Sequence, residues 1–215
     1  AFHKGRIYCT GGSGGGNVTL MANKLAPRTF ACCIDKCGMA RLTGDIAFNL
    51  DGGSELDARY SPDPESPRYL SHGAQALRYV GNPEHLAVIK QLGNSVKMIV
   101  VHGAEDAVCP VEDAREMVAN MEASGMDIEA IWVTKEMLDG ETFQSTGHPM
   151  GDRTRIVFYA ADKYLAPGSP DLVVRQGPTD FERKEAIRYE VPGGVYVISY
   201  ENGYPVGTFE RAKEG

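Results

Sequence analysis

Residues 6–16 of the chain read Arg-Ile-Tyr-Cys-Thr-Gly-Gly-Ser-Gly-Gly-Gly. The first five residues have the composition of a strand, and the glycine run predicts a sharp turn directly after it. From about Asn17 to Leu25, apolar residues recur at helical spacing. The stretch therefore predicts a strand, a tight turn and a helix in immediate succession.

The same alternation of strand and helix continues along the chain. We predict further strands at 30–35, 96–102 and 128–134, and helices at about 83–92, 111–124 and 155–165. Asn82-Pro83 is a typical helix start, since asparagine caps helices and proline is favoured at the first helical position. Alternating strands and helices predict an α/β fold with a mainly parallel sheet and flanking helices.

Two segments interrupt this alternation. Residues 39–81 carry turn-forming sequences and no long periodic run, which predicts an insertion or lid over the sheet edge. Three short strands are predicted within 186–209, and Asn202-Gly203 favours a type I′ hairpin turn between the last two. We therefore expect an α/β region at 1–167, with 39–81 inserted in it, and an appended antiparallel β-meander at 168–215.

Charge and hydropathy limit the kinds of partner. The chain carries 29 acidic and 22 basic side chains, a formal net charge of −7. Because such a chain repels a phosphate backbone, we expect no nucleic-acid partner. No apolar run approaches the roughly 20 residues that cross a bilayer, so we expect no membrane partner.

The cysteine pattern predicts buried thiols rather than a metal site. The chain has an odd number of cysteines, most of them in apolar runs: Cys9, Cys32, Cys33, Cys37 and Cys109. Free cysteine is among the most buried residue types. A disulfide from Cys37 to Cys109 or to Cys32 is an alternative. No pair has zinc spacing, so we expect no metal.

Ser13 is the candidate nucleophile. It lies in a G-x-S-x-G sequence between a predicted strand and a predicted helix, which is the setting of a nucleophile elbow. The helix behind the turn would direct free N–H groups at the reacting carbonyl, and the Gly14 N–H would be an oxyanion-hole donor. A flexible turn is the simpler alternative. A phosphate-binding loop is disfavoured because Gly16 is followed by asparagine rather than lysine.

An acid and then a histidine follow Ser13 along the chain, which is the order found in hydrolases that carry a nucleophile elbow. Asp106 comes directly after the strand at 96–102, and Asp35, at the end of the preceding strand, is the alternative acid. Of the five histidines, only His148 comes after Asp106. Ser13, Asp106 and His148 are therefore the candidate catalytic triad.

These three motifs resemble the α/β-hydrolase superfamily, particularly its esterase, dienelactone-hydrolase and prolyl-oligopeptidase-like branch. The resemblance covers about residues 6–165 and rests on the GGSxGG elbow, the HGxxDxxxP acid loop that begins at His102, and the late Gly147-His148 loop. It implies that residues 1–167 form a catalytic region. It also implies a serine hydrolase acting through an acyl-enzyme on a small ester or peptide-like substrate, without a cofactor.

The resemblance also implies a partner. The superfamily places further strands before the elbow, whereas 12 residues precede Ser13 here. We therefore expect association with another chain or with an N-terminal segment that supplies those strands. The alternative function is a non-catalytic, hydrolase-like interaction module, because a fold does not determine an activity.

Overall fold

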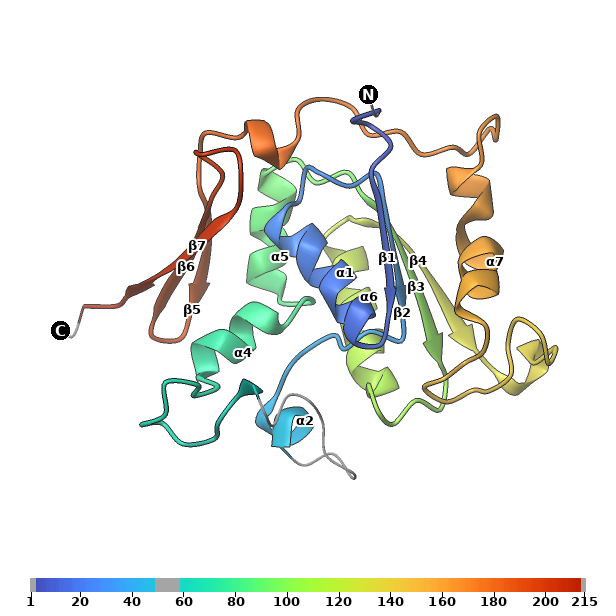
Figure 1. Ribbon diagram of the computed structural model, residues 1–215, viewed down its shortest axis with the longest axis horizontal. Helices are drawn as coiled ribbons and strands as arrows, with labels where there is room; N and C mark the ends of the chain where they lie inside the picture. The colour runs from blue at the N-terminus through green and yellow to red at the C-terminus, as the bar shows by residue number, and fades with distance from the viewer. Residues whose placement is uncertain (1–2, 49–58, 214–215) are drawn as a thin grey trace.

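The computed structural model describes residues 3–48 and 59–213 (Figure 1). A four-stranded, wholly parallel sheet in the order β1-β2-β3-β4 forms its centre. The strands are β1 (Tyr8–Gly12), β2 (Cys32–Lys36), β3 (Lys97–Gly103) and β4 (Asp127–Val133). The predicted strands are confirmed to within about two residues, which is the usual uncertainty of strand ends.

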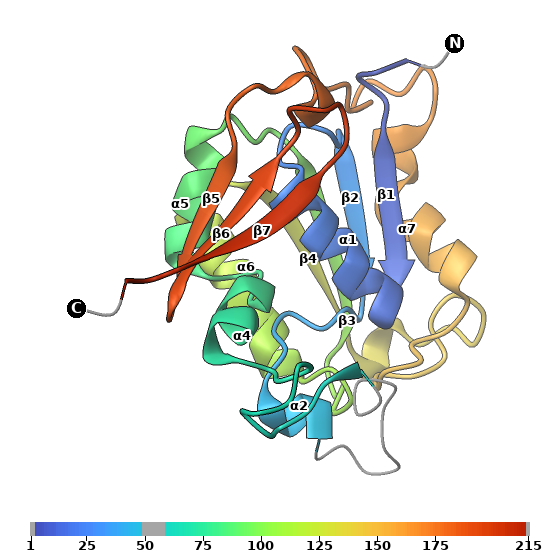
Figure 2. The ribbon, with the colours of Figure 1, turned by 60° about the vertical axis from the view of Figure 1, so that its left-hand side comes forward.

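Helices cover both faces of this sheet (Figures 1 and 2). One face packs on α1 (Gly14–Leu25), α5 (Pro83–Gln91) and α6 (Val111–Ala123), and the other on α7 (Arg153–Leu165). Side chains alternate along β3: Met98 and Val100 contribute to the first core, and Ile99 and Val101 to the second. This is why the strands are apolar throughout, as expected for a parallel sheet buried on both sides.

Local capping explains where two of these helices begin. The Asn82 side chain accepts hydrogen bonds from Glu84 N and His85 N, so α5 starts where the sequence predicts. The Asp152 side chain does the same for α7. Both caps satisfy backbone N–H groups that have no partner within the helix.

The segment at 39–81 contains more helix than we predicted. Residues 44–48 form α2 (Gly44–Phe48), and residues 72–78 form α4 (His72–Arg78). The turn-forming stretch at 51–54 lies outside the described residues. Figures 1 and 2 place α2 toward the carboxyl ends of the parallel strands. These helices are too short for periodicity to reveal, and a small core that includes Leu42, Ala47 and Leu70 stabilises this region.

A second, antiparallel sheet follows, as predicted, in the order β5-β6-β7. Its strands are β5 (Ile187–Val191), β6 (Gly194–Ser199) and β7 (Val206–Arg211). The predicted type I′ turn at Asn202-Gly203 is wrong. Residues 200–205 connect β6 to β7, and only Gly203 of the pair has positive φ, whereas a type I′ turn needs positive φ at both central residues.

The small sheet packs on the α/β body through α4 and α5, and its core also reaches α1. Ile187, Tyr189, Ile198 and Tyr200 belong to the same buried core as Leu20 of that helix. The Tyr189 hydroxyl donates to the Lys24 carbonyl oxygen, and the Tyr200 hydroxyl donates to the Leu25 carbonyl oxygen over 2.9 Å. These hydrogen bonds satisfy carbonyl groups at the end of α1 that the helix itself leaves free.

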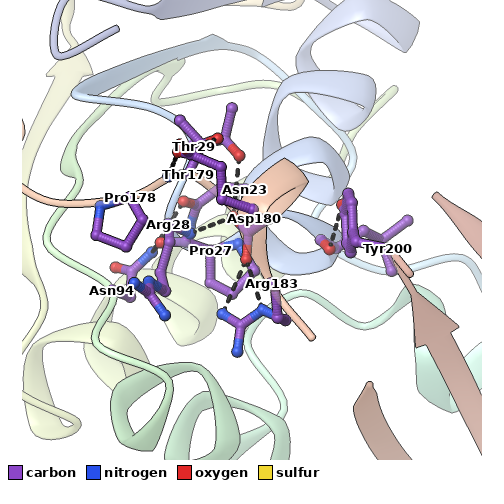
Figure 3. A network of polar contacts seen from close by, with 12 residues as sticks. Asn23, Pro27, Arg28, Thr29, Asn94, Pro178, Thr179, Asp180, Arg183 and Tyr200 are labelled. Atoms are coloured by element: carbon purple, nitrogen blue, oxygen red, sulfur yellow. Dashed lines mark hydrogen bonds and ion pairs between the residues drawn. The ribbon is translucent and has the colours of Figure 1, made fainter. Parts of the chain in front are cut away.

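A buried polar cluster joins the connection before β5 to the body (Figure 3). Asp180, in the short 3-10 helix η2 (Asp180–Glu182), is fully buried and accepts hydrogen bonds from Arg28 N and Thr29 Oγ1 at 2.6 and 2.9 Å. Its other carboxylate oxygen accepts from Arg183 at 2.9 and 3.1 Å. Every oxygen of this buried charge therefore has a partner, as burial requires.

The five cysteines are free, and four of them are buried: Cys32, Cys33, Cys37 and Cys109. This confirms the buried-thiol interpretation for those four, and neither disulfide alternative is formed. No helix within residues 3–48 and 59–213 has the length and hydropathy to span a bilayer.

Candidate active site

Ser13 occupies the turn between the end of β1 and the first residue of α1. Its backbone has φ 56° and ψ −120°, a conformation that a residue with a side chain seldom adopts. The Ser13 N–H donates to the Lys36 carbonyl oxygen at 2.9 Å, and Asn17 N donates to the Ser13 carbonyl oxygen at 3.0 Å. Strand β2 and helix α1 thus hold the strained turn in place.

Two glycines make this turn possible. A Cβ on Gly11 would lie 2.0 Å from the Gly15 carbonyl oxygen, and a Cβ on Gly16 would lie 2.3 Å from Asp35 Oδ1. Gly14 and Gly15 differ, because a Cβ on either would meet no atom within 4 Å. The close approach of strand and helix therefore requires Gly11 and Gly16, whereas Gly14 and Gly15 border open space at the start of α1.

Asp106 lies on the loop after β3 and is 3% exposed. Its Oδ1 accepts hydrogen bonds from Val108 N and Cys109 N at 2.9 and 3.0 Å. Its Oδ2 lies 2.9 Å from His148 Nδ1 and 3.2 Å from His102 Nε2. Burial alone would raise the pKa of Asp106, but these donors outweigh it and hold the pKa well below its ordinary value. The group is therefore a carboxylate at neutral pH.

His148 connects Asp106 to Ser13. Its Nδ1 contacts the Asp106 carboxylate, and its Nε2 lies 2.8 Å from Ser13 Oγ. With Asp106 ionised, Nδ1 carries the proton and donates, which leaves Nε2 to accept from the serine hydroxyl. The structure thus brings the three predicted residues into one continuous chain of hydrogen bonds.

The loop that carries His148 is hydrogen-bonded directly to the loop that carries Asp106. Glu105 N donates to the Thr146 carbonyl oxygen at 2.9 Å, and Thr146 Oγ1 donates to Glu105 Oε2 at 2.5 Å. Gly103 is required beneath this contact, because a Cβ there would lie 2.3 Å from the Thr146 carbonyl oxygen. These contacts fix the separation of Asp106 and His148.

Asp35, the alternative acid, lies apart from this chain of hydrogen bonds. It is fully buried beneath the start of α1, and neither of its oxygens makes a well-formed hydrogen bond within the described residues. Burial raises the pKa of Asp35 to about 7, against the opposing effects of the His102 ring and the Gly38 N–H. The carboxylate that contacts His148 is that of Asp106.

His102 is a neighbour of the site whose contact with the acid the sequence did not reveal. It is buried at the end of β3, and its Nε2 donates to the Cys109 carbonyl oxygen at 2.9 Å as well as facing Asp106. Burial opposes a charge on the ring, but these two acceptors raise the pKa of His102 above its ordinary value. The sequence signal for this contact was that His102 ends the predicted strand and stands four residues before Asp106.

Cys37 is the third potential metal ligand beside Asp106 and His148, with ligand atoms within 4.8 Å of one another. These residues fit a metal poorly. Both oxygens of Asp106 and both nitrogens of His148 already have hydrogen-bond partners. Burial raises the pKa of the Cys37 thiol to about 11, whereas metals bind the thiolate. The hydrogen-bond chain accounts for the closeness of Asp106 and His148.

A family model described as "Protein of unknown function (DUF2920)" matches residues 2–203 of the chain. None of the curated proteins matches the chain significantly.

Several solved structures resemble parts of the chain. Pyrococcus horikoshii acylaminoacyl peptidase is 16% identical, with a TM-score of 0.44, and the match covers 78% of this chain and 22% of that one. A thermostable esterase is 19% identical, with a TM-score of 0.42 and coverage of 75% and 30%. An acylaminoacyl peptidase in complex with Z-Gly-Gly-Phe-chloromethyl ketone is 16% identical, with a TM-score of 0.45 and coverage of 78% and 21%. The chain spans less than a third of each of these proteins.

Proposed function

The chain belongs to the DUF2920 family, and we propose that it is an α/β-hydrolase in which Ser13, His148 and Asp106 cleave an ester or amide bond. One observation carries the proposal: the hydrogen-bond chain from Ser13 Oγ to His148 Nε2 and from His148 Nδ1 to Asp106, at 2.8 and 2.9 Å. A hydroxyl, an imidazole and a carboxylate in that order are the parts of a serine hydrolase.

The reaction follows from the roles that each atom can take. His148 Nε2 accepts the hydroxyl proton as Ser13 Oγ attacks the substrate carbonyl, and the Asp106 carboxylate stabilises the imidazolium that forms. The same proton then passes to the leaving group, which departs and leaves an acyl-serine. His148 next takes a proton from a water molecule as the water attacks the acyl-serine carbonyl. The carboxylic acid product then departs, and His148 returns the proton to Ser13 Oγ.

The oxyanion that forms during attack needs nearby donors. Gly14 is the first residue of α1, so its N–H has no partner within the helix and the positive end of the helix dipole lies behind it. The open space beside Gly14 and Gly15 supports the approach of a substrate carbonyl. We assign Gly14 N–H as one oxyanion donor.

A fluorophosphonate probe tests the proposal, because it reacts with an activated serine hydroxyl. Intact mass and peptide mapping should show one label, on Ser13, and Ser13→Ala should remove it. Ser169→Ala is the matched control, since that serine lies beyond the end of α7 and should leave labelling unchanged. Absence of a label on the folded chain would instead favour the non-catalytic interaction module.

A further inference from the structure

A small cavity of about 150 Å³ opens beside the candidate triad. Its lining residues include Gly12 and Cys37 from the ends of two strands, His148 from the triad, and the two basic residues Lys36 and Arg153. The cavity therefore lies next to the reacting groups, where a substituent of a bound substrate would be placed.

Two cationic side chains meet at this cavity. Lys36 is 6% exposed, and its Nζ donates to the Arg153 backbone carbonyl oxygen at 3.1 Å. The Arg153 side chain lies over the nucleophile turn, since a Cβ on Gly12 would come within 3.7 Å of Arg153 Nε. The arginine thus reaches from the start of α7 to the residue that precedes Ser13.

Neither cation has an acidic partner within the described residues. Other basic groups do: Arg41 pairs with Asp113 and Glu116, and Arg155, two residues from Arg153, pairs with Glu141. The chain has 29 acidic side chains, so anions are plentiful. The pair at the cavity is nevertheless left without one.

The electrostatics of the pair favour an anion. Burial lowers the pKa of Lys36 first, and the neighbouring charge of Arg153 lowers it further. The carboxylates of Asp35 and Asp152 raise the pKa of Lys36, but neither forms an ion pair with it. Asp35 is buried beneath the turn, and Asp152 caps α7 through Thr154 N and Arg155 N. A bound anion would relieve the repulsion between the two cations.

We propose that Lys36 and Arg153 bind a carboxylate group of the substrate, so that the chain acts on anionic esters or amides. This inference rests on the proposed hydrolase activity and names its substrate class. The guanidinium and the ammonium supply charge-assisted hydrogen bonds to carboxylate oxygens, and the small cavity limits the group to a few atoms. The carboxylate would lie a few bonds from the scissile carbonyl, because the same cavity is bordered by His148.

A matched pair of esters tests the substrate class. Mono-p-nitrophenyl glutarate carries a free carboxylate, and its methyl ester has the same chain without the charge. We expect kcat/KM to favour the carboxylate by about tenfold or more, the range of a hydrogen-bonded charge. Arg153→Gln and Lys36→Gln should each remove most of that preference, measured as the ratio of the two kcat/KM values on the same variant.

Arg155→Gln is the matched control, since it removes the same charge from the same helix without reaching the cavity. It should keep the preference. Equal kcat/KM for the two esters in the wild-type chain would overturn the inference while leaving the serine hydrolase intact. Thermal melts of each variant separate loss of binding from loss of folding.

A binding measurement tests the carboxylate site even if neither ester is cleaved. Calorimetry with glutarate on the Ser13→Ala chain should detect binding that Arg153→Gln weakens by about tenfold or more and Arg155→Gln does not. No binding of glutarate would overturn the anion site. Failure of the fluorophosphonate label, by contrast, would count against the hydrolase and not against the cation pair.

Discussion

At the scale of single residues, the site depends on backbone that only a few side chains permit. Ser13 has positive φ without being glycine, and its two backbone hydrogen bonds to Lys36 and Asn17 maintain that conformation. Strain of this kind persists only where the surroundings over-determine it. The positions around Ser13 should therefore tolerate as few substitutions as Ser13, His148 and Asp106 themselves.

Gly16→Ala should destabilise the chain by about 1–3 kcal/mol, because the added methyl overpacks a closed contact. Its Cβ would lie 2.3 Å from Asp35 Oδ1 and 2.7 Å from Gly38 Cα. Gly15→Ala is the control in the same helix, where a Cβ meets nothing within 4 Å, and it should be neutral or slightly stabilising. Urea unfolding of both variants measures the difference, and equal midpoints would contradict the account of the turn.

Asp106→Asn should lower kcat on an activated ester by about three to four orders of magnitude, because an amide does not stabilise the imidazolium of His148. The loss of kcat is measured on a variant shown to be folded, because Asp106 is also a buried carboxylate and its neutralisation should cost stability as well. Asp113→Asn serves as the control, since that carboxylate lies on α6 and pairs with Arg41. A variant that keeps wild-type kcat would remove Asp106 from the mechanism.

At the scale of elements, strong local signals made the sheet and the long helices predictable. The apolar run of β3 and the Asn82-Pro83 start of α5 are such signals. The short helices α2 and α4 were missed because tertiary contacts, rather than propensity, stabilise them. For α4 one such contact is visible: Lys24 Nζ donates to the Leu77 carbonyl oxygen at 2.7 Å.

The candidate site was also predictable only where local sequence signals pointed to it. Chain order and strand ends were enough to choose Ser13, Asp106 and His148. The contact of His102 with Asp106 and the cation pair at the cavity depend on side-chain directions. Lys36 and Arg153 stand 117 positions apart, and no periodicity links them.

The buried lysine of α1 should make stability depend on pH. Burial lowers the pKa of Lys24 to about 7, and its two hydrogen bonds, to Leu77 and Tyr79 carbonyl oxygens, need only the two hydrogens of a neutral amine. Between pH 7 and the unfolded pKa of about 10.4, the unfolded chain binds the extra proton, so the free energy of unfolding rises with pH.

The comparison with Lys24→Met isolates this effect from other groups that titrate in the same range. The free energy of unfolding of the wild type, relative to the variant, should rise by on the order of 1 kcal/mol per pH unit from pH 7.5 to 9.5. Urea titrations at several pH values give the slope. A difference that stays constant with pH would show that Lys24 keeps an ordinary pKa.

At the scale of the whole molecule, one polar cluster attaches the connection before the small sheet to the α/β body. Asp180→Asn should destabilise the chain by about 3–5 kcal/mol, because it leaves the buried guanidinium of Arg183 without its partner. Lys4→Gln, which breaks an exposed pair with Glu182, is the control and should have little effect. Chemical unfolding of both variants tests this, and a mild effect of Asp180→Asn would mean that the cluster is not a main attachment.

The parallel sheet also has a free edge. Within the described residues β1 pairs only with β2, so its other side presents unpaired backbone groups. We propose that a strand from another chain or another segment pairs there. Sedimentation velocity should then show species larger than 23.3 kDa, and Thr10→Lys, at the exposed residue of β1, should weaken them. A monomer at high concentration would contradict association between copies of this chain.

The attachment of α1 at both ends has a dynamic consequence. Its first residue follows the strained serine, and its last carbonyls accept the hydroxyls of Tyr189 in β5 and of Tyr200 directly after β6. Fraying at either end would have to break contacts that are distant in sequence, so the amide protons of this helix should exchange with solvent only when the entire chain unfolds. The rigidity that a nucleophile needs would then be supplied by two tyrosines that lie 165 and 175 positions from the carbonyl groups they bind.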